Sequence, residues 1–365
     1  MNKIVLLLTI TLFAVASNHR FAPNKDCKSC HPAIWQEFQT SQHANATIFK
    51  DPIHAAVWKK NPASKKGAYK CAKCHTPAAD NIEELMAPNG IGPDPNNPTQ
   101  NDAVACAYCH RIKAIKEGLV SNTNIIDPKP KKYFGTRKDH IKSPYHEIDT
   151  SNPNFLKGNV CMGCHSHKRN KFGLNVCSTN ENREIENANC VSCHMPKVQG
   201  SVSNLRQTKD HSFHGFPGAH RHNEMLKEYV DIEFLPHLKG FEIAVNSKIP
   251  HDLLLHPARV AFVKVKVLRN KKPVFEKKEI LVRIIGADGK PTPPWLAREV
   301  VKDTMLKANE KRVFKYDFEL KSGDKVVAVL GYKLVKPPLA KKLGLEKEPI
   351  ATKPFILKKE VFEVR

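Results

Sequence analysis

Three things are scarce in this sequence: long apolar runs, acidic side chains, and cysteines outside one repeated pattern. After the first 16 residues, no segment approaches the roughly 18 consecutive apolar residues that a membrane helix needs. Asp and Glu number 36 against 59 Lys and Arg, so the formal net charge is +23. The missing apolar runs exclude a protein with several membrane-spanning helices, and the charge balance excludes an acidic surface.

The cysteines exclude another class, the disulfide-stabilised domain. Of the 11 cysteines, ten form five pairs of the type Cys-x-x-Cys, and only Cys177 stands apart. A disulfide framework within the chain is therefore impossible if the pairs have another use. Cys177 has two interpretations: a small buried apolar residue, or a thiol that assists catalysis.

The residue after each pair is histidine in all five cases, and this indicates their use. Cys-x-x-Cys-His is the attachment pattern of c-type haem: the thiols form thioethers with the vinyl groups, and the histidine takes one axial position on iron. The predicted thioether cysteines are Cys27, Cys30, Cys71, Cys74, Cys106, Cys109, Cys161, Cys164, Cys190 and Cys193. The predicted proximal histidines are His31, His75, His110, His165 and His194.

Other uses of paired cysteines explain the pattern less well. A zinc site or a redox dithiol also uses Cys-x-x-Cys, but zinc needs its ligands in groups of four, and neither use requires histidine as the next residue. Five covalently attached haem c groups, each with its iron, are therefore the predicted cofactors. Their propionates add about ten negative charges and offset much of the basic excess.

The N-terminus has the features of an export signal. Residues 1–3 give a short positive start, residues 4–15 are apolar apart from two threonines, and Ala14-Val15-Ala16 is a small-x-small cleavage site. We expect residues 1–16 to be a signal peptide, with an uncleaved anchor as the alternative. The predicted mature protein is periplasmic, and it is not an integral membrane protein after cleavage.

The remaining basic charge bears on partners. Nucleic-acid binding is disfavoured, because the sequence has no recognition motif and the compartment is wrong. A basic face that docks an acidic redox protein or an anionic membrane surface is favoured, and a plain solvated surface is the alternative.

The residue composition and the predicted secondary structure of the chain change near residue 225. Residues 17–224 hold all five motifs, a short helical pattern near Ile34–Phe38, and irregular loops such as residues 86–102. From 225 to 365 there is no cysteine, and short β-type runs alternate with turns. The predicted fold is α+β: a pentahaem cytochrome c domain of short helices and loops, followed by an immunoglobulin-like β-sandwich domain.

The residues around two of the motifs resemble a known family. Residues 27–44, with the first motif, Trp35 and the run Ser41-Gln42-His43-Ala44, resemble the start of multihaem cytochromes related to the tetrahaem cytochrome of ammonia-oxidising bacteria. The fifth motif with Met195-Pro196, and the stretch 214–220, resemble the same group.

The resemblance also implies distal ligands, the residues on the second axial face of iron. The segment Asn246–His251 resembles the start of a β-sandwich often appended to such cytochromes, although Pro250 stands where they have glycine. The distal ligands that the resemblance implies are His43, His146, His214, His220 and His251. His54, His167 and His211 are reserves.

Three functions remain open from the sequence. The first is an electron carrier with two histidines on each iron, which passes electrons between a quinol-linked membrane donor and a terminal reductase in anaerobic respiration. The second is an enzyme that reduces or oxidises a small nitrogen or sulfur compound at one five-coordinate haem, although the Cys-x-x-Cys-Lys motif of the pentahaem nitrite reductases is absent. The third is a docking subunit whose sandwich recruits a partner. No catalytic residue is predicted.

Overall fold

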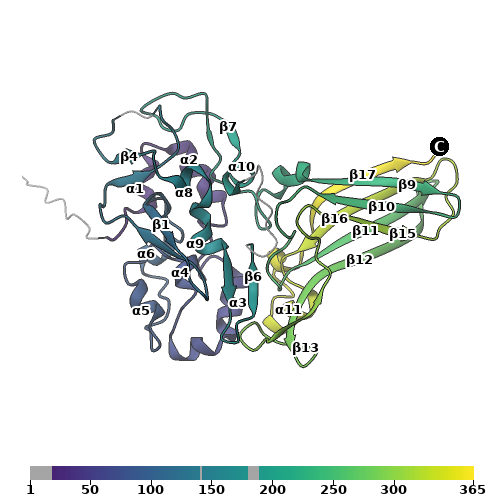
Figure 1. The fold of residues 1–365 in the computed structure, drawn as a ribbon, viewed down its shortest axis with the longest axis horizontal. Helices are drawn as coiled ribbons and strands as arrows, with labels where there is room; N and C mark the ends of the chain where they lie inside the picture. Colours follow the sequence, from purple (N-terminus) through teal and green to yellow (C-terminus); the bar gives the residue numbers. More distant parts are fainter. Residues whose placement is uncertain (1–18, 140–141, 180–188) are drawn as a thin grey trace, which may run out of the picture.

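The protein consists of an N-terminal part with short helices and hairpins and a C-terminal part with long strands, which lie side by side (Figure 1). The structure is a computed structural model in which residues 19–139, 142–179 and 189–365 are described. The predicted signal peptide, residues 1–16, lies outside the described residues. Within these ranges, no helix is long and apolar enough to cross a membrane.

The helices are short, and most lie in the N-terminal part. The α-helices are α1 (Asn24–Lys28), α2 (Pro32–Thr40), α3 (Pro52–Lys60), α4 (Ala72–His75), α5 (Ile82–Met86), α6 (Pro98–Asn101), α7 (Cys106–His110), α8 (Pro153–Leu156), α9 (Met162–His165), α10 (Cys190–His194), α11 (Pro337–Leu343) and α12 (Pro349–Thr352). The 3₁₀-helices are η1 (Pro62–Lys66), η2 (Asn159–Cys161) and η3 (Asn223–Tyr229).

Proline and capping side chains determine where several of these helices begin. Proline occupies the first turn of α2, α3, α6, α8, α11 and α12, where its missing N–H costs nothing. In α3 the Asp51 side chain also accepts hydrogen bonds from the backbone N–H groups of Ile53 and His54, at 2.9 and 3.1 Å. The helix predicted near residues 34–38 is confirmed as α2.

The sequence analysis predicted that the stretch 86–102 is an irregular loop, but part of it forms the helix α6. Asn97 caps α6 by accepting from the N–H groups of Thr99 and Gln100, and Gln100 is fully buried. The many Pro and Asn residues that suggest a loop are also the residues that start a helix, and four residues are too few to show helical periodicity.

The N-terminal part has small two-stranded sheets. Their strands are β1 (Ile112–Lys116) with β2 (Thr123–Ile126), β3 (Lys132–Phe134) with β4 (Glu147–Asp149), β5 (His167–Arg169) with β6 (Asn175–Ser178), and β7 (Lys197–Gln199) with β8 (Asp210–Ser212). The β3–β4 pair is parallel and the other three are antiparallel.

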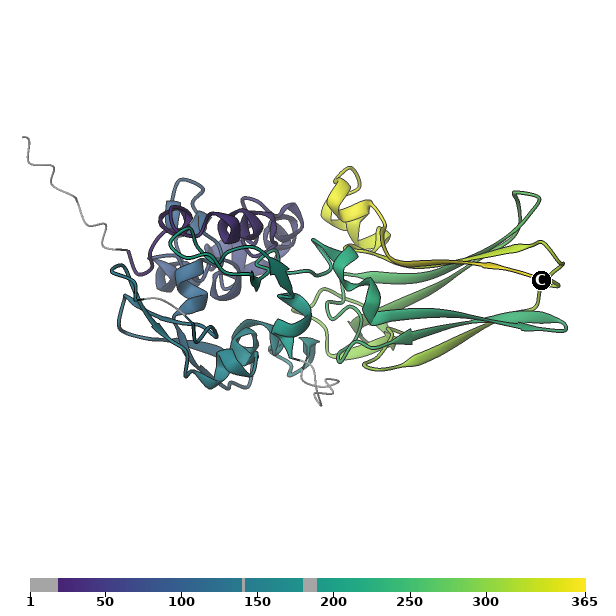
Figure 2. The same cartoon turned by 90° about the horizontal axis from the view of Figure 1, so that it is seen from above.

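The C-terminal part is a sandwich of two antiparallel sheets, which run lengthwise as two layers in Figure 2. Its strands are β9 (Val230–His237), β10 (Gly240–Ser247), β11 (Val260–Arg269), β12 (Lys272–Ala287), β13 (Lys290–Pro291), β14 (Glu299–Asp303), β15 (Lys311–Tyr316), β16 (Lys325–Lys333) and β17 (Phe355–Glu363). One sheet has the order β15-β10-β9, and the other runs β13-β12-β11-β16-β17 with β14 also paired to β12. This order matches the immunoglobulin arrangement, with β9, β10 and β15 opposite β11, β16 and β17.

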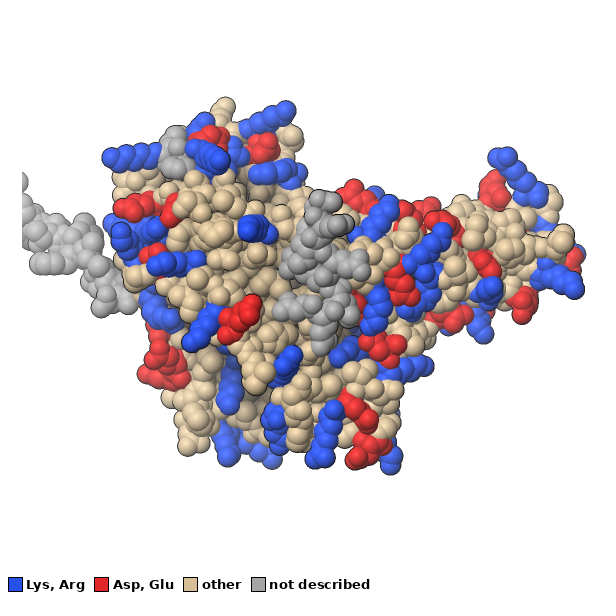
Figure 3. Space-filling model, viewed as in Figure 1, with Lys and Arg blue, Asp and Glu red and all other residues tan. Residues whose placement is uncertain are grey.

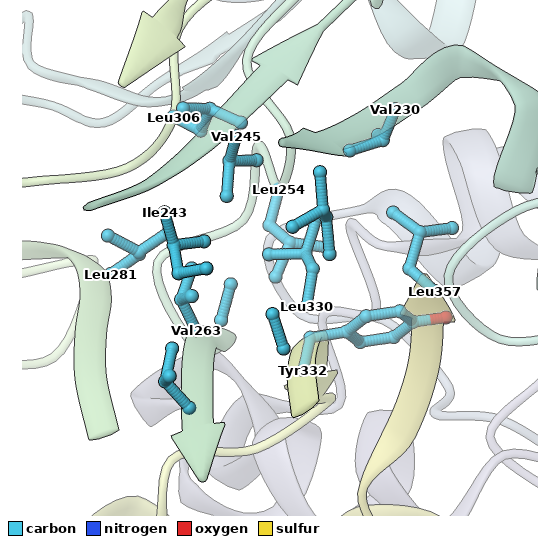
Figure 4. Packing of buried hydrophobic residues seen from close by; sticks show 14 of the residues in the cluster. Val230, Ile243, Val245, Leu254, Val263, Leu281, Leu306, Leu330, Tyr332 and Leu357 are labelled. Atoms are coloured by element: carbon cyan, nitrogen blue, oxygen red, sulfur yellow. The ribbon is translucent and has the colours of Figure 1, made fainter. Parts of the chain in front are cut away.

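The sandwich encloses the larger hydrophobic core of the molecule (Figure 4). Alternate residues of β11 point inward, so Val263 and Val265 are fully buried, as are Ile243 on β10 and Leu330 on β16. Burying each such side chain contributes about 1.5–3 kcal/mol. The predicted β-sandwich therefore has a core of its own, made of aliphatic side chains from both sheets.

The N-terminal part buries much less side-chain volume. Of its nineteen buried apolar residues among those described before residue 223, nine are alanine. They fall into small clusters, one around Tyr108 and Phe155 and another around Tyr69 and Leu85. Such clusters are too small to hold together about 200 residues, which is the behaviour expected where haem supplies most of the apolar interior.

The two parts are joined by hydrogen bonds between the β5–β6 hairpin and the sandwich. Arg283 on β12 donates to the carbonyl oxygens of Val176 and Asn175, both at 2.9 Å. The Asn170 side chain donates to the carbonyls of Pro294 and Ala297 at 2.8 and 2.7 Å. Arginine bound to two carbonyls fixes the hairpin against the sheet.

The surface shows no single charged face in the view of Figure 3. Lys and Arg alternate with Asp and Glu along the sandwich, and the N-terminal part shows wider uncharged areas between its basic side chains. On this side of the molecule the basic excess is therefore dispersed.

Candidate haem sites

Each Cys-x-x-Cys-His motif lies on or beside a short helix. The first borders α1, and the others coincide with α4, α7, α9 and α10. Residues three and four apart share one face of a helix, so both sulfurs and the histidine ring point the same way. The helical turn is closed by hydrogen bonds from His31 N to Cys27 O at 2.9 Å and from His75 N to Cys71 O at 3.0 Å.

The thiols have the environment that attachment to haem requires. All ten are only partly exposed to solvent, and burial raises the pKa of Cys71 and Cys109 to about 11. Among the described residues, no three His, Cys, Asp or Glu side chains come together to hold a metal ion.

Contacts between thiols bring the motifs together in pairs. A hydrogen bond from Cys106 lowers the pKa of Cys27, which connects the first motif with the third. A hydrogen bond from Cys164 likewise lowers the pKa of Cys74 and connects the second motif with the fourth. Motifs that are far apart in sequence thus meet at their attachment residues.

The motif histidines are oriented through their Nδ1 atoms. Nδ1 donates to a backbone carbonyl in four of them: His31 to Val202 at 2.7 Å, His75 to Ala46 at 3.1 Å, His110 to Phe134 at 2.7 Å, and His194 to Pro217 at 2.6 Å. Metal-binding histidines commonly make this bond, because it fixes the ring and leaves Nε2 for the metal.

Four motif histidines each face a second histidine. The ring centres are 6.3 Å apart for His31 and His146, 6.3 Å for His110 and His214, 5.9 Å for His165 and His43, and 6.2 Å for His194 and His251. A metal held at about 2 Å from a nitrogen of each ring separates the ring centres by about 6 Å. These pairs have the separation of two axial ligands on one iron.

The second motif is different. Its His75 is 4.0 Å from His54, centre to centre, which is too short for a metal between the rings. Both rings also donate Nδ1 to the same oxygen, the carbonyl of Ala46, at 3.1 and 3.0 Å. His54 therefore lies beside His75 and not opposite it.

The other candidate histidines, His220, His167 and His211, make no described ring contact with a motif histidine. Among the described ring contacts, none joins His220 to a motif histidine, although the resemblance implies it as a ligand. His167 donates Nε2 to Gly118 O at 2.9 Å. Both nitrogens of His211 are used, by Gly200 O and by Glu37 Oε1, at 2.9 and 2.8 Å.

Burial favours the neutral form of three of the paired imidazoles, His43, His214 and His165, and the neutral ring is the form that binds a metal. It lowers the pKa of His43 and of His214 to about 3, and that of His165 to about 4, with neighbouring histidine charges as the next cause. His75 is lowered to about 4, again chiefly by burial. These rings remain unprotonated over the whole neutral range.

One aromatic contact was not anticipated from the sequence. The Phe216 ring packs edge-on against His43 at 4.4 Å and against His214 at 5.9 Å. It therefore connects the fourth-motif pair to the third-motif pair. Phe216 has a positive φ of 50°, a backbone conformation that a bulky residue adopts only when its surroundings hold it there.

Part of the chain matches a known protein family. Residues 26–111, which contain the first three motifs, match the family of cytochrome c554 and c-prime. This match confirms the resemblance to multihaem c-type cytochromes that the sequence shows. No curated protein matches the chain.

The fold of the chain is similar to that of a solved structure. A penta-heme cytochrome c552 from Thermochromatium tepidum superposes with a TM-score of 0.74 at 20% identity, over 94% of this chain and 99% of the other. Chicken MD-1 complexed with lipid IVa is also found, over 28% of this chain and 68% of the other at 14% identity, but its TM-score of 0.15 carries no structural conclusion. The cytochrome c552 match confirms the predicted order of a haem region followed by strands.

Proposed function

We propose that this protein is a periplasmic pentahaem cytochrome c that carries electrons between a quinol-linked membrane donor and a terminal reductase. The observation that carries the proposal is the set of four histidine pairs with ring centres 5.9–6.3 Å apart. An iron with imidazole on both faces has no position for a substrate, and its task is to gain and lose an electron. The haem c groups supply that redox chemistry when bound.

The pairs give a ligand assignment for four of the five motifs. His146 serves the first motif, His214 the third, His43 the fourth and His251 the fifth. Of the distal ligands implied by the resemblance, only His220 has no place in this assignment. The ten motif cysteines hold the cofactors, and the carbonyl acceptors of Nδ1 fix the planes of the rings.

The contacts between motifs support a path for electrons among the first four motifs. The first and third motifs meet through Cys27 and Cys106, and the second and fourth meet through Cys74 and Cys164. Phe216 lies between the two groups. The protein contributes spacing and rigidity along this path, which decide how readily electrons pass between neighbouring sites.

The division of the chain follows from the same proposal. Residues 1–16 are the signal peptide, 17–224 the pentahaem domain and 225–365 the sandwich domain. Export is required because the thioethers form outside the bacterial cytoplasm.

A second function is favoured by the second motif. His75 has no partner at the separation of two axial ligands in the part of the chain that is described, since His54 is only 4.0 Å away. A haem attached there keeps one open face, and we propose that a small nitrogen or sulfur compound binds at it. The protein then combines four relay sites with one reactive site.

Mass spectrometry and electron paramagnetic resonance of the purified mature protein test both functions. We expect the mass of the chain without residues 1–16 plus five haems, four low-spin irons, and one high-spin iron. A mass equal to the bare chain contradicts the whole proposal. Five low-spin irons remove the second function and leave the carrier.

A further inference from the structure

The variable residues inside three of the Cys-x-x-Cys-His motifs converge on one strand. The residue before the second cysteine is Lys73 in the second motif, Tyr108 in the third and Gly163 in the fourth. Each of them lies against Thr123 or Asn124 at the start of β2. Figure 1 shows α9 beside β1, and α9 contacts both strands of the β1–β2 hairpin. The haem attachment pattern sets no residue type at these positions, so their convergence has another cause.

Asn124 makes the central contacts of this group. Its side-chain Nδ2 donates to Tyr108 Oη at 3.0 Å and to Cys164 Sγ at 3.6 Å. Tyr108 belongs to the third motif and is buried, whereas Cys164 is an attachment cysteine of the fourth motif. An amide group carries two hydrogens, so one side chain reaches two predicted haem sites at once.

The other end of the same amide shows why the donors matter. Asn124 Oδ1 is enclosed by protein and has no hydrogen-bond partner among the described residues. An unsatisfied buried oxygen costs about 1–3 kcal/mol, a cost that an apolar side chain of similar size would avoid. The amide is therefore retained here for its N–H donors.

Gly163 provides the space that this amide occupies. A Cβ atom at position 163 would overlap the Asn124 amide, and even its nitrogen would be only 2.8 Å away. The φ of Gly163 is not positive, so the backbone at this position does not itself require glycine. The absence of a side chain between the two cysteines of the fourth motif is what admits Asn124.

The residues on either side of Asn124 hold it in place. Lys73 Nζ donates to Thr123 Oγ1 at 2.9 Å, which ties the strand to the second motif. Asn122 Nδ2 donates to the carbonyl oxygen of Met162 at 3.1 Å, which ties it to the fourth. These three consecutive residues, from position 122 to position 124, thus bond to the second, third and fourth motifs.

We propose that Asn124 is a positioning residue that raises the midpoint potential of the fourth haem and fixes that haem relative to the third. Hydrogen bonds to a sulfur that holds a metal cofactor withdraw electron density, and they favour the reduced form. The contact with Cys164 acts in this way, and the contact with Tyr108 joins the third motif to the fourth. The inference rests on the proposed electron carrier, because it specifies how two of its sites are tuned and coupled.

The test compares the wild-type holoprotein with N124A, G163A and the double variant N124A/G163A. Alanine at position 124 removes the amide and leaves room for a Cβ atom at position 163. The matched controls are N96A and G135A. Asn96 is exposed, and a Cβ atom at Gly135 would meet only Ile148 Cγ2, at 3.8 Å.

The readout is a potentiometric titration followed by electron paramagnetic resonance, with haem content taken from the mass. The signal of the fourth haem is the low-spin signal that disappears in His43→Ala, because His43 is assigned as its second axial ligand. We expect N124A and G163A each to lower the midpoint potential of this signal. The ratio of reduced to oxidised fourth haem at a fixed applied potential falls about two- to tenfold, and tenfold corresponds to about 59 mV for one electron.

The double variant separates this route from a general disturbance. We expect it to match N124A, because the Cβ atom added at position 163 then enters the space that the amide has left. The controls leave every midpoint potential unchanged. Shifts that add in the double variant overturn the inference, because the two changes then act separately.

Two results distinguish this inference from the proposed function. Unchanged potentials in N124A and G163A, in protein whose mass includes five haems, overturn the role of Asn124 and leave the electron carrier standing. A mass equal to the bare chain contradicts the carrier itself. If N124A loads fewer than five haems, G163A decides, because it displaces the same amide and keeps asparagine at position 124.

Discussion

Removing His251 tests the link between the sandwich and the fifth motif. The ring centre of His251 is 6.2 Å from that of His194, and the two rings are inclined by 14°. Its Nδ1 donates to Asp252 O at 2.8 Å, an arrangement common among metal-binding histidines. In His251→Ala the iron of the fifth motif keeps only His194, so it changes from low spin to high spin.

The size of the change follows from the number of pairs. The structure has four histidine pairs at ligand separation, so the low-spin resonance falls by about a quarter. The high-spin signal doubles from one iron to two, and the haem content stays at five. The assay is quantitative electron paramagnetic resonance of the oxidised protein, with added imidazole expected to restore the lost low-spin signal.

The control is His237→Ala. His237 lies on β9, its side chain is 53% exposed, and its Nε2 atom is 3.5 Å from Oε1 of Glu242. We therefore expect its loss to leave the ligands of every iron unchanged. An unchanged spectrum in His251→Ala, together with loss of a low-spin signal in His220→Ala, refutes the assignment and the geometric argument behind it.

Three further predictions concern stability and the relay. Leu330→Ala removes a fully buried side chain of the sandwich and costs about 2–5 kcal/mol in chemical denaturation, whereas Leu238→Ala, at a fully exposed position, stays within about 0.5 kcal/mol. Arg269 donates two hydrogen bonds to Asp324, both 2.8 Å, and Asp324→Asn removes one of the two acceptor oxygens together with the negative charge, which costs about 1–3 kcal/mol at neutral pH. Because Arg269 lowers the pKa of Asp324 below 3.8, this difference from the wild type shrinks as the pH falls below 3.8 and through the native pKa. A difference that stays constant with pH contradicts the prediction. Phe216→Ala frees the rings of His43 and His214, so a potentiometric titration shows two shifted midpoint potentials, whereas Phe172→Ala on the exposed hairpin turn shifts none.

The sequence alone predicts those structural features that depend on residues close together in the chain. The motifs are local, and so is the alternation that reveals β11 and β16, whose inward residues are Val263, Val265 and Leu330. Strand β14 (Glu299–Asp303) has no apolar alternation, because four of its five residues are exposed, so its sequence does not indicate a strand. The first half of β12 is also mostly exposed and gives no such signal.

The histidine pairs depend on the tertiary fold. His31 and His146 are separated by more than one hundred residues, and nothing in the spacing of either one identifies the other. The resemblance implied the four histidines that face motif histidines, and it also implied His220, which makes no described ring contact with one. His54 was predicted only as a reserve ligand. Its position beside His75 depends on a carbonyl that both rings share, that of Ala46, and the sequence does not reveal this contact.

The bonds of Arg283 to the β5–β6 hairpin have an evolutionary consequence. A C-terminal domain that makes no contacts with the preceding domain can be lost from a lineage in one deletion. Here a deletion after residue 224 removes Arg283, which binds the carbonyl groups of Val176 and Asn175. It also removes His251, whose ring faces that of His194. The shortened gene would need compensating changes at two distant places before its product could work, so the two modules are expected to be inherited together.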